Sequence, residues 1–254
     1  MQDLTYKNYI FDFYGTLVDI LTDEEDLAVW QQLTSLYATY GADYTPHRLR
    51  QKYLDLIKAE EERLYEQTVY KHVEIDLVVI FIKLLTESEK THPTENHIKD
   101  MESWGNLIAN VFRINSRKIL KAYPNTLKTL QTIKDKGGKI FILSNAQRAF
   151  TQPEIELTGC ADLVDKIYIS SDFQMKKPQP DFMHHLLEEN HLDIADCVMV
   201  GNDFTSDMLV ASAVGMDGIL LNTFPYSSEE IAKLNTMNAK VIDDIAELLD
   251  NITD

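Results

Sequence analysis

The feature that most constrains this sequence is a regular alternation of short apolar runs and helical stretches in its second half. Apolar runs at 139–143, 167–169, 198–200 and 218–221 are typical of buried strands. The stretches between and around them carry helical signals, at 124–133, 150–157, 180–190 and 207–214. Strands that alternate with helices predict an α/β fold, in which a parallel sheet is covered by helices on both faces.

The N-terminal part of the chain adds a further strand to this sheet and then a long insertion. Residues 6–14 crowd apolar and aromatic side chains before Gly15, which predicts a buried strand. From about 21 to 117 apolar residues recur at helical spacing and strand-like alternation is absent, while Thr91-His92-Pro93 is typical of a helix break. We therefore predict a core domain formed by 1–20 and 118–254, and an all-helical domain formed by 21–117.

Composition narrows the classes of function. The 254 residues carry a formal net charge of −17, and an acidic surface disfavours binding to nucleic acid or anionic membranes. No run approaches the roughly 18 apolar residues that a membrane span needs, and residues 1–8 lack an apolar signal core. Cys160 and Cys197 have no metal-type spacing and suit a reducing compartment. We expect a cytoplasmic protein, monomeric or homodimeric.

Chemically active side chains follow four of the predicted strands. They are Asp12, Tyr14 and Thr16 after the first strand, Ser144 and Asn145 after the second, Lys177 after the third, and Asp203 with Asp207 after the fourth. Open α/β sheets bind ligands at the carboxyl ends of their strands, so we expect these residues to meet at one edge.

This set of residues has a consistent chemistry. A carboxylate such as Asp12 can attack phosphorus or carbon and form an ester intermediate. With an anionic phosphate as the target, Asp12 and Asp203 can share Mg²⁺, and Lys177 can neutralise charge. The hydroxyl groups of Thr16 and Ser144, with backbone N–H groups near Asn145, can hold phosphate oxygens. A small anionic substrate is therefore the expected partner.

Four motifs in order resemble those of the haloacid dehalogenase superfamily, of the helical-cap type. The motifs are Asp12 to Thr16 with Leu17-Val18-Asp19, Ser144 in Leu-Ser-Asn, Lys177 in Lys-Pro-Gln-Pro, and Gly201-Asn202-Asp203 with Asp207. The resemblance implies a Rossmann-like core with a helical cap inserted after the first motif. It implies that Asp12 is the nucleophile and that the backbone carbonyl of Tyr14 is a metal ligand.

Two parts of the motifs favour different activities within the family. Phosphatases that the sequence resembles carry an acid/base aspartate where this chain has Tyr14, and a phenol with a pKa of about 10 replaces it poorly. Tyrosine there is what 2-haloacid dehalogenases show, although Tyr14 can also simply pack under the cap. Asp203 and Asp207 instead favour a magnesium site, because neighbouring carboxylates repel one another without a cation. An alternative alignment places Asn202 in the position of Asp203.

These observations predict a Mg²⁺-dependent small-molecule phosphatase that works through an aspartyl intermediate. Asp12, Tyr14 and Lys177 are the predicted catalytic residues, Thr16, Ser144 and Asn145 bind substrate, and Asp12, Tyr14, Asp203 and Asp207 serve the metal. The first alternative is a metal-independent 2-haloacid dehalogenase that uses Asp12 on carbon. The second is a non-enzymatic binding protein that kept the fold.

Overall fold

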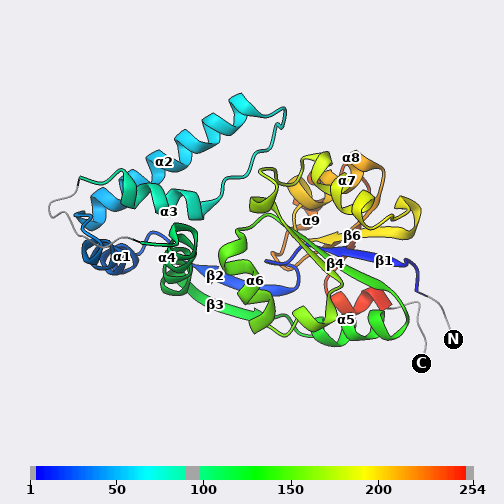
Figure 1. The fold of residues 1–254 in the computed structure, drawn as a ribbon. Helices are drawn as coiled ribbons and strands as arrows, with labels where there is room; N and C mark the ends of the chain where they lie inside the picture. Colours follow the sequence, from blue (N-terminus) through cyan, green and yellow to red (C-terminus); the bar gives the residue numbers. More distant parts are fainter. Residues whose placement is uncertain (1–3, 90–97, 250–254) are drawn as a thin grey trace.

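The computed structural model describes residues 4–89 and 98–249, and a six-stranded sheet lies at its centre (Figure 1). The strand order is β5-β4-β1-β6-β7-β8, and every neighbouring pair is parallel. The strands are β1 (Asn8–Phe11), β4 (Lys139–Ser144), β5 (Lys166–Ile169), β6 (Cys197–Gly201), β7 (Asp217–Leu221) and β8 (Lys240–Ile242). The predicted α/β, Rossmann-like fold is therefore confirmed.

Helices cover both faces of the sheet, because the strands are apolar on both sides. One face packs against α5 (Thr126–Asp135), α6 (Arg148–Leu157) and η5 (Ile245–Leu249). The other packs against α7 (Pro180–Glu189), α8 (Leu209–Val214) and α9 (Ser228–Leu234). The two layers bury separate apolar clusters, and they hold the strand ends in fixed register.

In the described part of the chain, four helices are inserted between β1 and α5, and they lie to one side of the sheet (Figure 1). They are α1 (Leu27–Thr39), α2 (Pro46–Gln67), α3 (Leu77–Thr86) and α4 (Met101–Ser116). They share an apolar core of their own, which includes Trp30, Tyr53, Phe81 and Phe112. The division into domains at 20/21 and 117/118 stays a prediction, and the predicted helix break at 91–93 lies outside the described residues.

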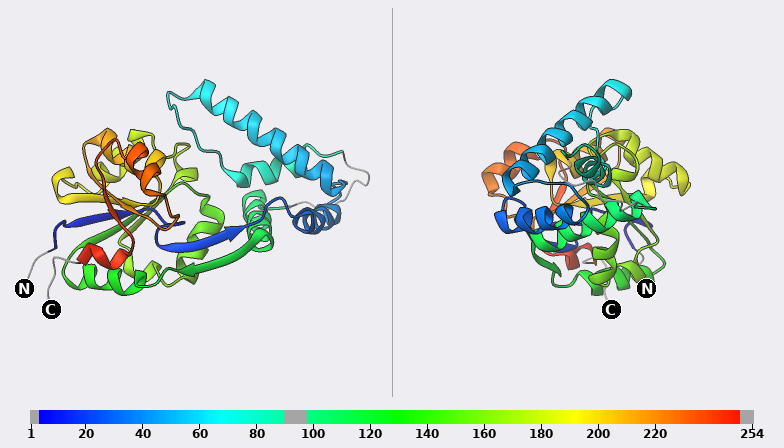
Figure 2. Two further views of the ribbon diagram at one scale, coloured as in Figure 1. Left: turned by 180° about the vertical axis from the view of Figure 1, so that it is seen from behind. Right: turned by 60° about the vertical axis from the view of Figure 1, so that its left-hand side comes forward.

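An antiparallel ribbon that the sequence did not predict connects the inserted helices to the sheet (Figure 2). It consists of β2 (Val18–Thr22) and β3 (Arg117–Ala122). Both strands are short and only partly buried, so their apolar residues do not form the clear alternation that identifies a strand. The pairing is set by contacts about 100 residues apart in sequence, as between Val18 and Ala122.

The N-terminal strand is shorter than predicted, since β1 ends at Phe11 rather than at residue 14. The chain turns there, because the N–H groups of Thr16, Leu17 and Val18 all donate to the carbonyl of Phe13. Asp12, the residue after the end of β1, therefore lies at the carboxyl edge of the sheet. In the part of the chain that the structure describes, no helix is long and apolar enough to cross a bilayer.

Candidate active site

Asp12 lies directly after β1, at the carboxyl edge of the sheet. Its backbone N–H donates to the carbonyl of Val200 on β6 at 2.9 Å, which continues the sheet by one residue. The following turn needs glycine at position 15, where φ is +80°. A Cβ there would also lie 2.5 Å from Nδ2 of Asn202. The turn therefore fixes the Asp12 side chain against the loop that follows β6.

Lys177 is buried between two carboxylates. Its Nζ donates to Oδ1 of Asp12 at 2.8 Å, to Oδ1 of Asp207 at 2.7 Å and to the carbonyl of Leu143 at 2.6 Å. Burial alone lowers the pKa of Lys177, but the attraction of Asp12 and Asp207 outweighs it, so the pKa is raised. Lys177 is therefore an ammonium group that three hydrogen bonds hold in place, one of them to Asp12.

Asp207 fastens the loop after β6 to Lys177. Its second oxygen, Oδ2, accepts hydrogen bonds from the backbone N–H groups of Asn202 at 3.0 Å and Asp203 at 3.1 Å. A Cβ at Gly201 would lie 2.3 Å from this carboxylate, so only glycine leaves room for it. Burial raises the pKa of Asp207 to about 6, and the charge of Lys177 offsets only part of that rise.

The Ser144 hydroxyl is buried at the carboxyl end of β4. Its Oγ has no hydrogen-bond partner among the described residues. An unpaired buried hydroxyl costs about 1–3 kcal/mol. The neighbouring Asn145 side chain is fully engaged with Lys177, since its Nδ2 donates to the Lys177 carbonyl at 2.9 Å and its Oδ1 accepts from the Lys177 N–H at 2.8 Å. Asn145 therefore positions the loop that carries Lys177.

One cavity of about 340 Å³ collects most of these side chains. It is lined by Asp12, Tyr14, Ser144, Asn145, Lys177, Asn202, Asp203, Ser206, Asp207, Phe224 and Tyr226. Thr16 is buried and does not line this cavity. Its hydroxyl donates to Oδ1 of Asn202 at 3.3 Å or to Oδ2 of Asp12 at 3.4 Å. All other predicted site residues meet at this cavity.

The oxygen atoms around Asp12 differ in their availability to a metal ion. Both oxygens of Asp207 are bonded to Lys177 or to backbone N–H groups. Asp203 uses Oδ1 to cap the turn at Thr205. No group of three His, Cys, Asp or Glu side chains within residues 4–89 and 98–249 lies close enough to hold a metal by itself. Mg²⁺ is commonly bound by one or two carboxylates, and the side chains of Asp12 and Asp203 both line this cavity.

The Tyr14 hydroxyl is directed into a buried charge network. It donates to Oε2 of Glu154 and lies 3.0 Å from Oγ1 of Thr151. Glu154 also accepts from Nε of Arg113 at 2.8 Å and from Nη1 of Arg117 at 2.8 Å. Burial, together with the charge of Glu154, holds the pKa of Tyr14 well above its usual value. A phenol in this state is a poor proton donor at neutral pH.

We expect Tyr14→Phe to change kcat less than tenfold, because the hydroxyl is bonded to Glu154 rather than offered to a substrate. Loss of a positioned acid or base would instead lower kcat by roughly 10²–10⁴-fold. The variant leaves Glu154 paired with Arg113 and Arg117, so the free energy of unfolding should fall by only about 0.5–1.5 kcal/mol. Steady-state kinetics and urea denaturation measure the two effects. A hundredfold loss of kcat would make Tyr14 catalytic.

The sequence interpretation missed the buried network around Glu154. Glu154 and Arg113 lie 41 residues apart and belong to no motif, so nothing local pairs them. One signal was present: Arg113 falls on the face of α4 that also buries Ile108, Ala109 and Phe112. A charged residue on an apolar helix face is rarely buried unless it has a partner.

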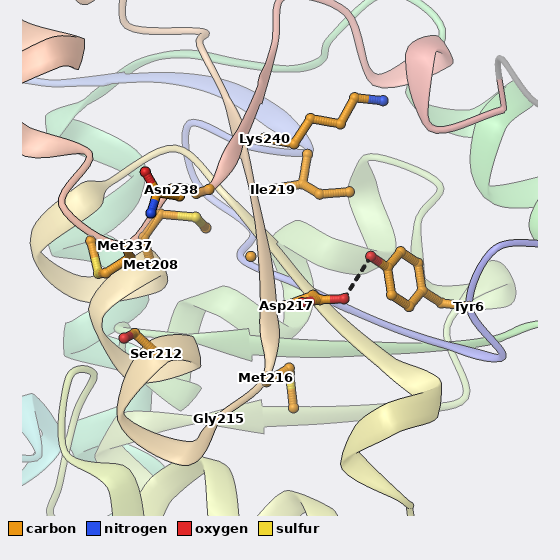
Figure 3. A pocket seen from close by; sticks show the side chains of 12 residues that line it. Tyr6, Met208, Ser212, Gly215, Met216, Asp217, Ile219, Met237, Asn238 and Lys240 are labelled. Carbon is orange, nitrogen blue, oxygen red and sulfur yellow. Dashed lines mark hydrogen bonds between the residues drawn. The ribbon is translucent and has the colours of Figure 1, made fainter.

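A second cavity, of about 390 Å³, lies away from this site (Figure 3). Its lining includes Asp217 and Lys240, the first residues of β7 and β8, together with Met208, Met216 and Met237. Asp217 accepts a hydrogen bond from the Tyr6 hydroxyl at 3.0 Å. The cavity is therefore at the amino ends of the strands, and it shares no lining residue with the site around Asp12.

Comparison with known proteins places the chain among hydrolases. A family profile described as haloacid dehalogenase-like hydrolase matches residues 6–215. A glyceraldehyde 3-phosphate phosphatase of Methanothermobacter thermautotrophicus is 30% identical over 131 residues, which are 51% of this chain and 58% of that protein. A phosphoglycolate phosphatase of Psychrobacter arcticus is 26% identical over 241 residues, covering 95% of this chain and 93% of that one.

The fold is shared with solved structures of lower sequence identity. A 2-haloacid dehalogenase from Pseudomonas syringae superimposes with a TM-score of 0.68 at 16% identity, and the match covers 97% of this chain and 98% of the other. At that level of identity, the likeness concerns the fold alone.

Proposed function

The chain belongs to the haloacid dehalogenase-like hydrolase family, and on that premise we propose that it hydrolyses phosphate monoesters of small molecules. The observation that carries this proposal is the unpaired, buried hydroxyl of Ser144 on the wall of the cavity that holds Asp12. A non-bridging phosphate oxygen would supply the missing partner. The relatives named above, which are a sugar-phosphate and a phosphoglycolate phosphatase, support the same chemistry.

In the proposed reaction Asp12 is the nucleophile. Lys177 binds Oδ1 of Asp12, so Oδ2 is the proposed attacking atom, and the ammonium group balances charge on the carboxylate and the phosphoryl group. Ser144 and the backbone near Asn145 hold the transferred group. The Tyr14 hydroxyl is bonded to Glu154, so the leaving oxygen takes its proton from water as its bond to phosphorus breaks. We therefore expect faster turnover with good leaving groups. Water then hydrolyses the aspartyl phosphate, which releases phosphate and restores the Asp12 carboxylate.

The donor set at the cavity fits the Mg²⁺ that the family implies. Asp12 and Asp203 would hold it, with the Tyr14 carbonyl and Asn202 as further oxygen donors, and the ion would neutralise phosphate charge. Asp207, whose oxygens are already bonded, would organise the loop rather than bind the ion directly. The cytoplasmic location and the monomeric or homodimeric state stay predictions.

The deciding experiment compares two substrates with and without the metal. Purified protein is assayed on p-nitrophenyl phosphate and on 2-chloropropionate, each in Mg²⁺ and in EDTA. We expect phosphate release that depends on Mg²⁺ and no chloride release. Chloride release that persists in EDTA would support the dehalogenase alternative, and it would overturn the phosphatase proposal.

We expect Ser144→Ala to raise the stability of the protein and to lower its activity. Alanine removes an unpaired buried hydroxyl, so the ligand-free protein should be more stable by about 1 kcal/mol. The same change removes a phosphate contact, and kcat/KM for p-nitrophenyl phosphate should fall roughly 10–100-fold. Urea denaturation and steady-state kinetics give the two readings. A variant that is less stable but fully active would contradict the role assigned to Ser144.

A further inference from the structure

A cavity between the sheet and the inserted helices adjoins the site around Asp12. It has a volume of about 340 Å³, within the range of roughly 300–1,000 Å³ usual for small-molecule sites. Tyr14 and Asn145 line both cavities. If a phosphate group is held at Asp12, the rest of the substrate would therefore extend into this adjoining cavity. We call this space the leaving-group cavity.

Two carboxylates line the leaving-group cavity. Glu24 follows β2, and Glu74 precedes α3. Glu74 is held in place because its Oε2 accepts from the Ser170 hydroxyl at 2.9 Å, and its Oε1 lies 3.4 Å from Nε2 of Gln147. Burial raises the pKa of Glu74. Glu74 therefore accepts hydrogen bonds, and a further negative charge beside it is disfavoured.

The positive charge on the wall of this cavity is already engaged. Arg113 makes two hydrogen bonds to Glu154, from Nε at 2.8 Å and from Nη2 at 3.0 Å. Its guanidinium carbon lies 5.1 Å from the ring centroid of Tyr14 and 4.6 Å from that of Phe150. The guanidinium group is thus paired with a carboxylate and enclosed by two rings, so it offers little to an anionic ligand.

The other basic residues near the start of the insertion do not line the cavity. Arg48, Arg50 and Lys52 form exposed or half-exposed ion pairs with Glu89, Glu25 and Glu87. Lys176 partly offsets the charge of Glu74, but it is not a lining residue. The Gln147 amide is occupied as well, since its Nε2 donates to the Ile75 carbonyl and its Oε1 accepts from the Leu77 N–H.

We propose that the leaving group bears hydroxyl groups, as in a sugar or polyol phosphate, and that Glu24 and Glu74 disfavour a leaving group with a carboxylate. The inference rests on the proposed phosphatase function. Hydroxyl groups donate to the carboxylate oxygens of Glu24 and Glu74, whereas a second anion would be repelled by both. The charge pattern of this cavity is therefore opposite to what a carboxylate-bearing substrate such as phosphoglycolate requires.

A matched set of two-carbon substrates tests the inference. The compounds are 2-hydroxyethyl phosphate, phosphoglycolate and O-phosphoethanolamine, which place a hydroxyl, a carboxylate and an ammonium group at the same position. With Mg²⁺ present, kcat/KM for 2-hydroxyethyl phosphate should exceed that for phosphoglycolate by about tenfold, because the partly buried Glu74 and the exposed Glu24 both repel the second anion. The two carboxylates attract the ammonium group of O-phosphoethanolamine, so its kcat/KM should also exceed that for phosphoglycolate.

The possible outcomes separate this inference from the proposed function. Equal or faster turnover of phosphoglycolate would overturn the exclusion of carboxylates, and turnover of phosphoethanolamine as slow as that of phosphoglycolate would show that charge repulsion is not the cause. Turnover of p-nitrophenyl phosphate with none of the three would overturn the substrate class alone. Failure to hydrolyse p-nitrophenyl phosphate as well would overturn the proposed function, and the inference with it.

A variant that removes the charge of Glu74 tests whether this cavity causes the difference in turnover between the two substrates. Glu74→Gln should raise the ratio of phosphoglycolate to 2-hydroxyethyl phosphate turnover by about tenfold, because one repelling charge is removed. Glu66→Gln, at an exposed position on α2, is the matched control and should leave the ratio unchanged. If Glu74→Gln does not fold, Glu24→Gln provides the same reading. An unchanged ratio in a folded variant would contradict the inference.

Discussion

Replacing Asp12 with asparagine is expected to lower kcat for phosphate release by about 10⁴-fold or more, the scale seen when a nucleophile is removed. The amide has nearly the shape of the carboxylate but cannot form the ester intermediate. Its oxygen can still accept the hydrogen bond from Lys177, which keeps Asp207 as a charged partner. The fold should therefore survive, and kinetics on p-nitrophenyl phosphate report the chemistry.

Asp19→Asn is the matched control for this experiment. Asp19 lies on β2, seven residues after Asp12, and its carboxylate pairs with Lys121 at 3.4 Å outside the cavity. The control should keep kcat within about threefold of the unmodified protein, since exposed ion pairs contribute little. Circular dichroism melting confirms that both variants are folded. If Asp12→Asn kept more than about one hundredth of the activity, another group would be the nucleophile.

The sheet and most of the site could be predicted because their signals are local. The predicted strands β1, β4, β5, β6 and β7 are apolar runs, and ligands bind where parallel strands end. The edge strand β8 was not predicted, because it has only three residues and begins with the exposed Lys240. Reading the residues just past the ends of the predicted strands was enough to bring together Asp12, Ser144, Lys177 and Asp203, which do line one cavity. Their roles as catalytic, substrate-binding and metal residues stay predictions, while the membership in the family of hydrolases is confirmed.

What the sequence could not predict depends on contacts between distant elements. The Tyr14 hydroxyl donates to Glu154, 140 residues away, and nothing in the sequence indicated that contact. Glu74 lines the leaving-group cavity only because the segment before α3 runs beside the loop that leads to Lys177, where the Glu74 N–H donates to the Gln174 carbonyl at 3.1 Å. Such pairings arise from tertiary packing, and they have no period or motif.

The second large effect is a loss of stability, which we expect for Lys177→Met measured in EDTA. Methionine has a similar length but leaves Asp12 and Asp207 facing each other without the ammonium group, and it leaves the Leu143 carbonyl without a partner. Breaking a buried ion pair by removing one member costs about 3–5 kcal/mol. We expect a loss of that size in the free energy of unfolding at pH 8. Lys176→Met, at the neighbouring half-exposed lysine, should change it by less than about 0.5 kcal/mol.

The loss should shrink in acid, because Asp207 has a pKa of about 6 in the folded protein against 3.8 for an ordinary aspartate. A carboxyl group whose folded pKa is raised stabilises the fold when protonated, and this contribution disappears as pH rises through about 6. Without Lys177 the ionised Asp207 is unpaired, so the variant should suffer most above pH 7 and recover as pH falls toward 5. Urea denaturation at pH 5, 6, 7 and 8 measures this trend. An equal loss at every pH would show that packing, rather than the charge of Asp207, accounts for the effect of Lys177.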